Sequence, residues 1–160
     1  MKQFVRLGVV LAVLLALFAT VSAHEPRVIG GKYNLALGWS HEPAYTGLLN
    51  QVEIFISEVD PNAPTPAPGA ADDEAGGTPV AGADETLKLE VGYGGKTKVL
   101  KLSEDYETKG HYLADIIPTQ PGDYTFHLTG KIGDTDVDET FNSADGKFSS
   151  VEPITDIQFP

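Results

Sequence analysis

Residues 112–129 decide the fold and read Tyr-Leu-Ala-Asp-Ile-Ile-Pro-Thr-Gln-Pro-Gly-Asp-Tyr-Thr-Phe-His-Leu-Thr. The stretch holds two alternating runs separated by turn residues, among them two prolines and a glycine. A period of two is typical of a strand with one buried face. We therefore predict two strands at the centre of a β-sandwich. The apolar positions that define their buried faces are Tyr112, Ala114 and Ile116 in the first run, and Tyr124, Phe126 and Leu128 in the second.

The turn that precedes the second run adds a more specific signal. Pro121-Gly122-Asp123-Tyr124 is similar to the tyrosine corner of immunoglobulin-like sandwiches. Further alternating runs, with turn residues between them, occupy residues 32–39, 50–57, 87–93, 96–102 and 137–141. The pattern predicts an all-β fold, an immunoglobulin-like antiparallel β-sandwich of about seven to eight strands, without a helix in its ordered part.

The first 23 residues have the pattern of a secretory signal peptide. Lys2 and Arg6 precede an apolar run at residues 7–18, and small or β-branched residues end the segment at Ala23. We predict a signal-peptide helix that is cleaved after Ala23; an uncleaved anchor is the alternative, but the run is short for a membrane span. No second apolar run follows. The sequence therefore predicts a secreted or periplasmic protein with no transmembrane anchor after cleavage.

The remainder, residues 24–160, has the length of a single domain. Residues 60–77 interrupt it with a segment rich in Pro, Ala and Asp that lacks large apolar side chains. Such a composition cannot bury enough surface to offset the entropy of folding, so we predict a disordered insertion within one domain. The chain has no cysteine, which excludes disulfides and zinc–thiolate sites.

Charge and motifs narrow the range of possible functions. With 11 basic and 23 acidic residues, the chain has a formal net charge of −12 and would be repelled by nucleic acid and by anionic membrane surfaces. No nucleophile elbow, phosphate loop or metalloprotease motif is present. The first hypothesis is therefore an exported binding or accessory module of the bacterial cell envelope that is not an enzyme. Its partner would be another envelope protein.

The predicted new N-terminus offers a second hypothesis. Cleavage after Ala23 makes His24 the first residue, and a terminal amine with its own imidazole can chelate a metal ion. A second imidazole would complete a three-nitrogen site suited to Cu(II). The candidates for it are His127 and His111, with His41 third. The alternative function is thus a periplasmic or extracellular Cu(II)-binding protein. A secreted enzyme that uses this copper oxidatively is a third hypothesis, and chance placement of surface histidines is the simplest interpretation.

An acidic ladder near the end of the domain is a candidate for Ca²⁺. Alternation places Asp134, Asp136 and Asp138 on one side of a strand, next to Glu139. The glycine and the closing glutamate of an EF-hand loop are absent, so a solvated hairpin face is the simpler interpretation. Another hypothesis is a binding patch of aromatic residues near the loops, although core packing explains these residues equally well. They are Trp39, Tyr45, Tyr93 and Tyr106.

Four short segments, at residues 50–56, 77–83, 110–115 and 121–126, resemble the small exported domains of the YtkA/FixH-like type. The resemblance implies an immunoglobulin-like sandwich located in the bacterial envelope. Related families include copper-handling proteins of the CopC type, which use a mature N-terminal histidine. Lys147 stands where that family has a ligand histidine, so no ligand is transferred from it to this chain.

Overall fold

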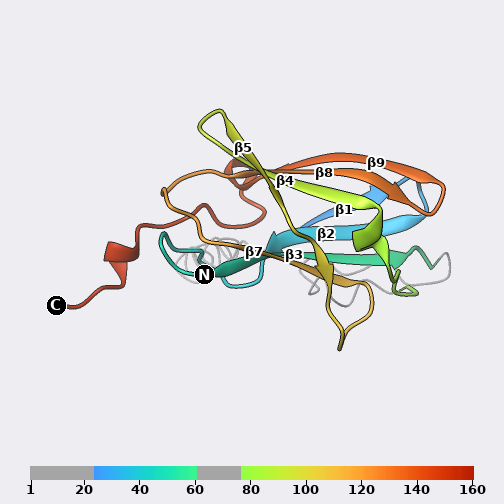
Figure 1. Ribbon diagram of the computed structural model, residues 1–160, viewed down its shortest axis with the longest axis horizontal. Helices are drawn as coiled ribbons and strands as arrows, with labels where there is room; N and C mark the ends of the chain where they lie inside the picture. Colours follow the sequence, from blue (N-terminus) through green and yellow to red (C-terminus); the bar gives the residue numbers. More distant parts are fainter. Residues whose placement is uncertain (1–23, 61–76) are drawn as a thin grey trace, which may run out of the picture.

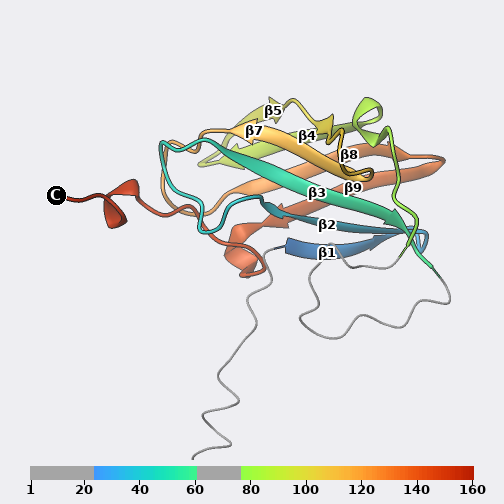
Figure 2. The same ribbon diagram turned by 90° about the horizontal axis from the view of Figure 1, so that it is seen from below.

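The computed structural model describes residues 24–60 and 77–160, and these form two antiparallel β-sheets packed face to face (Figure 1). The predicted signal peptide and residues 61–76 of the predicted insertion lie outside the described residues. Figure 2, seen from below, shows the strands of one sheet side by side with the other sheet behind them. The all-β sandwich predicted from the sequence is confirmed.

Nine strands build the two sheets. They are β1 (His24–Ile29), β2 (Tyr33–Trp39), β3 (Asn50–Glu58), β4 (Leu87–Tyr93), β5 (Lys96–Leu100), β6 (Ser103–Glu104), β7 (His111–Ile116), β8 (Thr125–Ile132) and β9 (Thr135–Asn142). The five-stranded sheet has the order β1-β2-β3-β7-β6, and the four-stranded sheet has the order β5-β4-β8-β9. The described residues also include 3₁₀ turns at η2 (Ala83–Glu85), η3 (Ser143–Asp145) and η4 (Ile154–Asp156). None of the helical turns within the described ranges is long and apolar enough to cross a membrane.

The two runs that predict the fold belong to opposite sheets. β7 lies in the five-stranded sheet and β8 in the four-stranded sheet, so residues 117–124 carry the chain from one layer to the other. Five of the six predicted inward residues are buried, and Ile116 is partly buried. The five are Tyr112, Ala114, Tyr124, Phe126 and Leu128. These side chains meet between the layers, where they form much of the core.

Trp39, at the end of β2, lies in the core. Its ring packs edge-on against Tyr124 and Phe126, with centroid distances of 6.1 Å and 5.1 Å. Its indole N–H donates a hydrogen bond to the carbonyl of Ser149 at 2.9 Å. The ring therefore joins the two sheets and also holds the C-terminal segment against them.

The tyrosine corner is also present. The hydroxyl of Tyr124 donates a 3.0 Å hydrogen bond to the carbonyl of Gln120, four residues upstream. The tyrosine is 5% exposed, so this bond forms where water cannot easily replace it. It fixes the crossing segment between β7 and β8.

We expect Tyr124→Phe to lower the free energy of unfolding by about 1–2 kcal/mol, because the Gln120 carbonyl loses its donor while the packing of the ring is kept. Urea denaturation followed by circular dichroism would measure the change. Tyr106→Phe is the matched control, since Tyr106 is 93% exposed. A loss as large in the control as in Tyr124→Phe would contradict the role of the corner.

A tight hairpin joins β4 to β5. Gly94 and Gly95 both have positive φ, 55° and 78°, as a two-residue type I′ turn requires. The turn sets the register in which Tyr93 pairs with Lys96, and Val91 with Lys98. β5 is left as the outer strand of its sheet.

Candidate metal centre

Two of the four histidines meet at one carboxylate on the outer face of the five-stranded sheet. His24 Nε2 lies 3.1 Å from Glu53 Oε1, and His111 Nε2 lies 3.5 Å from Glu53 Oε2. The side chains of His24, Glu53 and His111 are only 13–14% exposed. We refer to these three residues as the His–Glu–His cluster.

Strand register brings the cluster together. His24 on β1 is opposite Gly38 on β2, and Gly38 is opposite Glu53 on β3. Because glycine has no side chain, the imidazole of His24 can extend over β2 and reach the next strand but one. His111 on β7 is opposite Phe55, two residues along β3 from Glu53 and on the same face.

The ring of Phe55 supports both imidazoles. It stacks on His111 with a centroid distance of 4.5 Å and an interplanar angle of 5°. It meets His24 edge-on at 5.4 Å and 84°. These contacts hold the two histidine rings in defined orientations beside an apolar wall.

A loop carboxylate orients His111 from its other side. Asp105 Oδ2 lies 3.0 Å from His111 Nδ1, and Asp105 Oδ1 accepts the backbone N–H of Glu107 at 2.9 Å. That backbone hydrogen bond, together with the contact to His111, holds the pKa of Asp105 below its ordinary value. Gly110 lets the loop approach β3, since a Cβ there would lie 2.6 Å from the carbonyl oxygen of Ile56.

The Nε2 atom of His111 is the least satisfied polar atom of the cluster. It is buried and has no hydrogen-bond partner. In the neutral imidazole, when Nδ1 donates its proton to Asp105, Nε2 carries a lone pair that faces the Glu53 carboxylate. An electron pair facing an anion calls for a cation between them, either a proton or a metal ion.

The surroundings of the cluster favour a positive charge. Burial acts to raise the pKa of Glu53, but hydrogen bonds from His24 and Ser40 and the charge of the imidazoles outweigh it, and the pKa lies below its ordinary value. Nearby Glu42 has its pKa raised by burial, although it accepts hydrogen bonds from Ser149. Of these two glutamates, Glu53 is therefore the one that holds its negative charge more readily.

The other predicted ligands lie elsewhere. His127 is on the outer face of the opposite sheet, where its Nε2 lies 2.7 Å from Asp138 Oδ1. His41 is exposed in a loop, and the contacts it makes with Asn50 are through its backbone. Of the acidic ladder, Asp136 and Asp138 are exposed on β9, whereas Asp134 lies in the turn before the strand. Asp136 pairs with Lys131 at 2.6 Å.

The cluster is not a preformed metal cage. Within residues 24–60 and 77–160, no three His, Asp or Glu side chains are already arranged to hold a metal ion. Glu53 lies between the imidazoles and bonds to His24, so an entering ion must displace that hydrogen bond. His24 directs Nε2 toward Glu53, whereas the predicted chelate with a terminal amine would use Nδ1, the nitrogen closer to the backbone.

Sequence reasoning missed the carboxylates of the site, Glu53 and Asp105, and the supporting ring of Phe55. One signal was available: Glu53 and Phe55 occupy the positions of β3 that alternate with the buried Val52, Ile54 and Ile56. Comparison of the chain with protein-family models, curated proteins and solved structures found no match. The resemblance to YtkA/FixH-like domains thus stays a prediction.

Proposed function

We propose that this protein is an exported, non-enzymatic binding module of the cell envelope that holds a Cu(II) ion between His24 and His111. The carrying observation is the buried Nε2 of His111, which makes no hydrogen bond and lies 3.5 Å from the carboxylate that His24 also contacts. Export is supported by the signal-peptide pattern of residues 1–23.

The spacing of the donor atoms fits this role. Nitrogen and oxygen ligands at about 2.0–2.1 Å from a tetrahedral or square-planar ion lie about 2.8–3.4 Å from one another. The two histidine–carboxylate separations of the cluster, 3.1 Å and 3.5 Å, are close to that range. The side chains would still have to move to bring three donors onto one ion, since no three in the described residues are already so arranged.

The second coordination layer fits as well. Histidines that bind metals commonly donate their other ring N–H to a carboxylate, which fixes the tautomer and strengthens the ligand. Asp105 occupies that position beside His111 Nδ1. Among divalent ions, Cu(II) binds nitrogen and oxygen donors most tightly, which is why we name it as the ligand.

The test is a calorimetric Cu(II) titration of the chain that begins at His24, compared with a chain carrying one extra alanine before His24. Because the proposed donor is the ring Nε2 and not the amine, we expect one ion per chain in both proteins, with dissociation constants within about threefold of each other. Electron paramagnetic resonance would report the nitrogen ligands.

Two results would overturn the proposal. One is the absence of one-to-one binding in either protein. The other is tight binding that the extra alanine abolishes, which would place the ion on a terminal amine chelate independent of the fold. Competition with Zn(II) belongs to the same experiment, and preference for Zn(II) at equal concentrations would contradict the choice of metal.

A further inference from the structure

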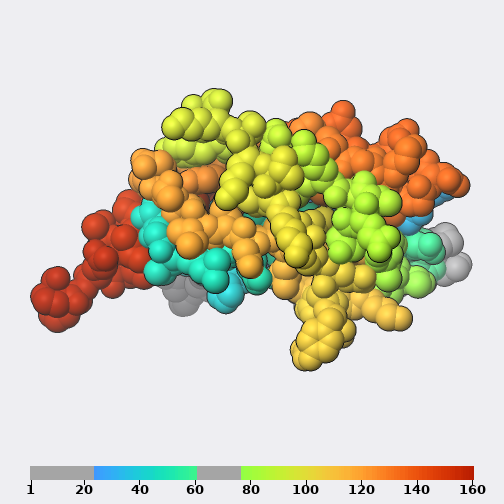
Figure 3. Space-filling model, in the orientation of Figure 1, coloured from blue at the N-terminus to red at the C-terminus, as the bar shows by residue number. Residues whose placement is uncertain are grey.

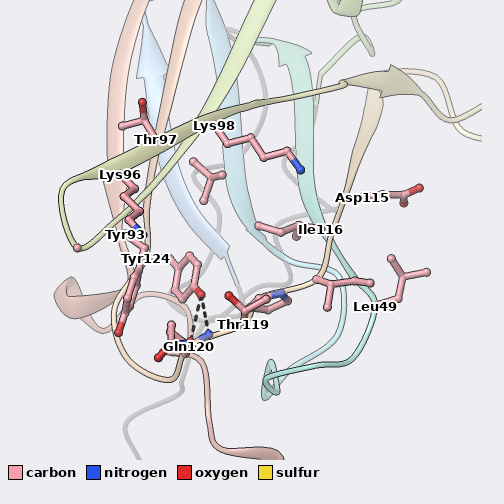
Figure 4. A pocket seen from close by; sticks show the side chains of 14 residues that line it. Leu49, Tyr93, Lys96, Thr97, Lys98, Asp115, Ile116, Thr119, Gln120 and Tyr124 are labelled. Carbon is pink, nitrogen blue, oxygen red and sulfur yellow. Dashed lines mark hydrogen bonds between the residues drawn. The ribbon is translucent and has the colours of Figure 1, made fainter.

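A cleft opens at the side of the sandwich between β5 and the end of β7, and none of its lining residues belongs to the His–Glu–His cluster. Its volume is about 950 Å³. Figure 4 shows side chains of both layers around it. Its apolar lining comes from Leu49, Val91, Tyr93, Ile116, Ile117 and Tyr124.

Two lysines and one aspartate, Asp115, line this cleft, so its charged side chains sum to 2 − 1 = +1. Lys96 and Lys98 lie on the same face of β5 as the buried Leu100, and both line the cleft. Figure 4 shows Lys98 extending from β5 toward Ile116. Within the described residues neither lysine forms an ion pair, whereas Lys88 and Lys131 both do. In a chain with a net charge of −12, this cleft is suited to an acidic and apolar occupant.

The C-terminal tail has that chemistry. Phe159 is 97% exposed and Ile157 is 54% exposed, and Asp156 directly precedes them. Ile157 and Phe159 are two residues apart, so an extended chain would present both on one face. Figure 3 shows the tail standing out from the body of the molecule.

The root of the tail is fixed at the same end of the sandwich as the cleft. Val151 and Gly122 exchange two backbone hydrogen bonds, and the N–H of Thr46 donates to Glu152 at 2.9 Å. Beyond this root the tail points away from its own molecule in both views (Figures 1 and 2). Its apolar residues are presented outward, to a neighbour.

We infer that the tail of one copy docks in the cleft of a second copy. Ile157 and Phe159 would cover the apolar lining, and Asp156 would approach Lys96 and Lys98. Inward-pointing lysines on an outer strand oppose pairing with another strand, so the contact forms through side chains, not through an added β-strand. The inference does not depend on the metal site, because none of its residues belongs to that site.

The contact joins different surfaces of the two copies. Two anchors make a small interface, so the association is weak, with a dissociation constant on the order of 100 µM. A head-to-tail contact closes into a ring or a reciprocal pair only when the geometry allows it, and otherwise extends into chains.

The experiment is sedimentation velocity on the chain from His24 to Pro160 between 10 µM and 1 mM, at low ionic strength. We expect the mean mass to rise with concentration, and Phe159→Ala and Lys98→Glu each to weaken association about tenfold. Lys88→Glu is the control, because it changes the charge equally on the outer face of β4, away from the cleft. Combining Lys98→Glu with Asp156→Lys should restore association.

A monomer at every concentration would overturn the inference. So would association that Phe159→Ala leaves unchanged, or that Lys88→Glu weakens as much as Lys98→Glu. Hydrogen exchange covers the remaining case: protection of residues 156–159 in a monomeric sample would place the tail in the cleft of its own chain, against our inference.

Discussion

Trp39→Ala is expected to lower the free energy of unfolding by about 3–5 kcal/mol, the range observed when a buried aromatic side chain is reduced to a methyl group. The ring is 1% exposed and contacts two other aromatic rings of the core. Its removal leaves a cavity between the sheets and also deprives the Ser149 carbonyl of its donor. A loss of this size is a large part of the stability of a domain of this length.

Urea denaturation followed by far-ultraviolet circular dichroism should measure this change, since Trp39 is the chain's single tryptophan and its fluorescence disappears with it. Tyr106→Ala serves as the control, with an expected change below about 0.5 kcal/mol at a fully exposed position. A loss below about 1 kcal/mol for Trp39→Ala would mean that this end of the core is far less tightly packed than described.

His111→Ala is expected to weaken Cu(II) binding by about 100-fold or more, because it removes one of two imidazole ligands. His127→Ala provides a control of the same chemistry on the opposite sheet, and we expect it to change the dissociation constant by less than about twofold. Asp105→Asn should fall between them, about tenfold weaker, since it alters only the orientation and basicity of His111.

Calorimetric titration of the three variants and the parent chain makes this comparison, with circular dichroism to show that each is folded. Equal losses in His111→Ala and His127→Ala would point to non-specific binding by surface histidines. An unchanged affinity in His111→Ala would remove it from the site, whatever the behaviour of the N-terminus.

The fold could be predicted because its strands are strongly alternating. The inward positions of β3, β7 and β8 follow directly from a period of two, and the Pro-Gly-Asp-Tyr turn gives the tyrosine corner at Tyr124. These are local signals, which require no knowledge of which strands are neighbours.

β1 and β6 could not be predicted in the same way. β1 contains Pro26, which cannot donate a ladder hydrogen bond and argues against a strand except at the edge of a sheet, where β1 lies. β6 has only two residues and falls within a charged segment that reads as a loop. Their pairing depends on neighbours that are distant in the sequence.

Only part of the candidate site could be predicted from the sequence, for the same reason. His111 and His127 have equivalent local patterns, since each lies among alternating apolar residues, and only the sheet order separates them. The meeting of His24 with Glu53 depends on a register that places Gly38 between them. A single sequence shows which residues are present but not the strand register that places them next to one another.

The His–Glu–His cluster could cross-link strands in a chain that has no cysteine and therefore no disulfide. His24 is in the outermost strand, Glu53 in the third, and His111 in the fourth, so an ion held there would act as a cross-link over four of the five strands. The three side chains come together only in the folded chain, so the ion would bind the folded state alone. A ligand at 100 times its dissociation constant adds about 2.7 kcal/mol to the free energy of unfolding. The resistance of the chain to proteolysis would then rise and fall with the supply of the metal.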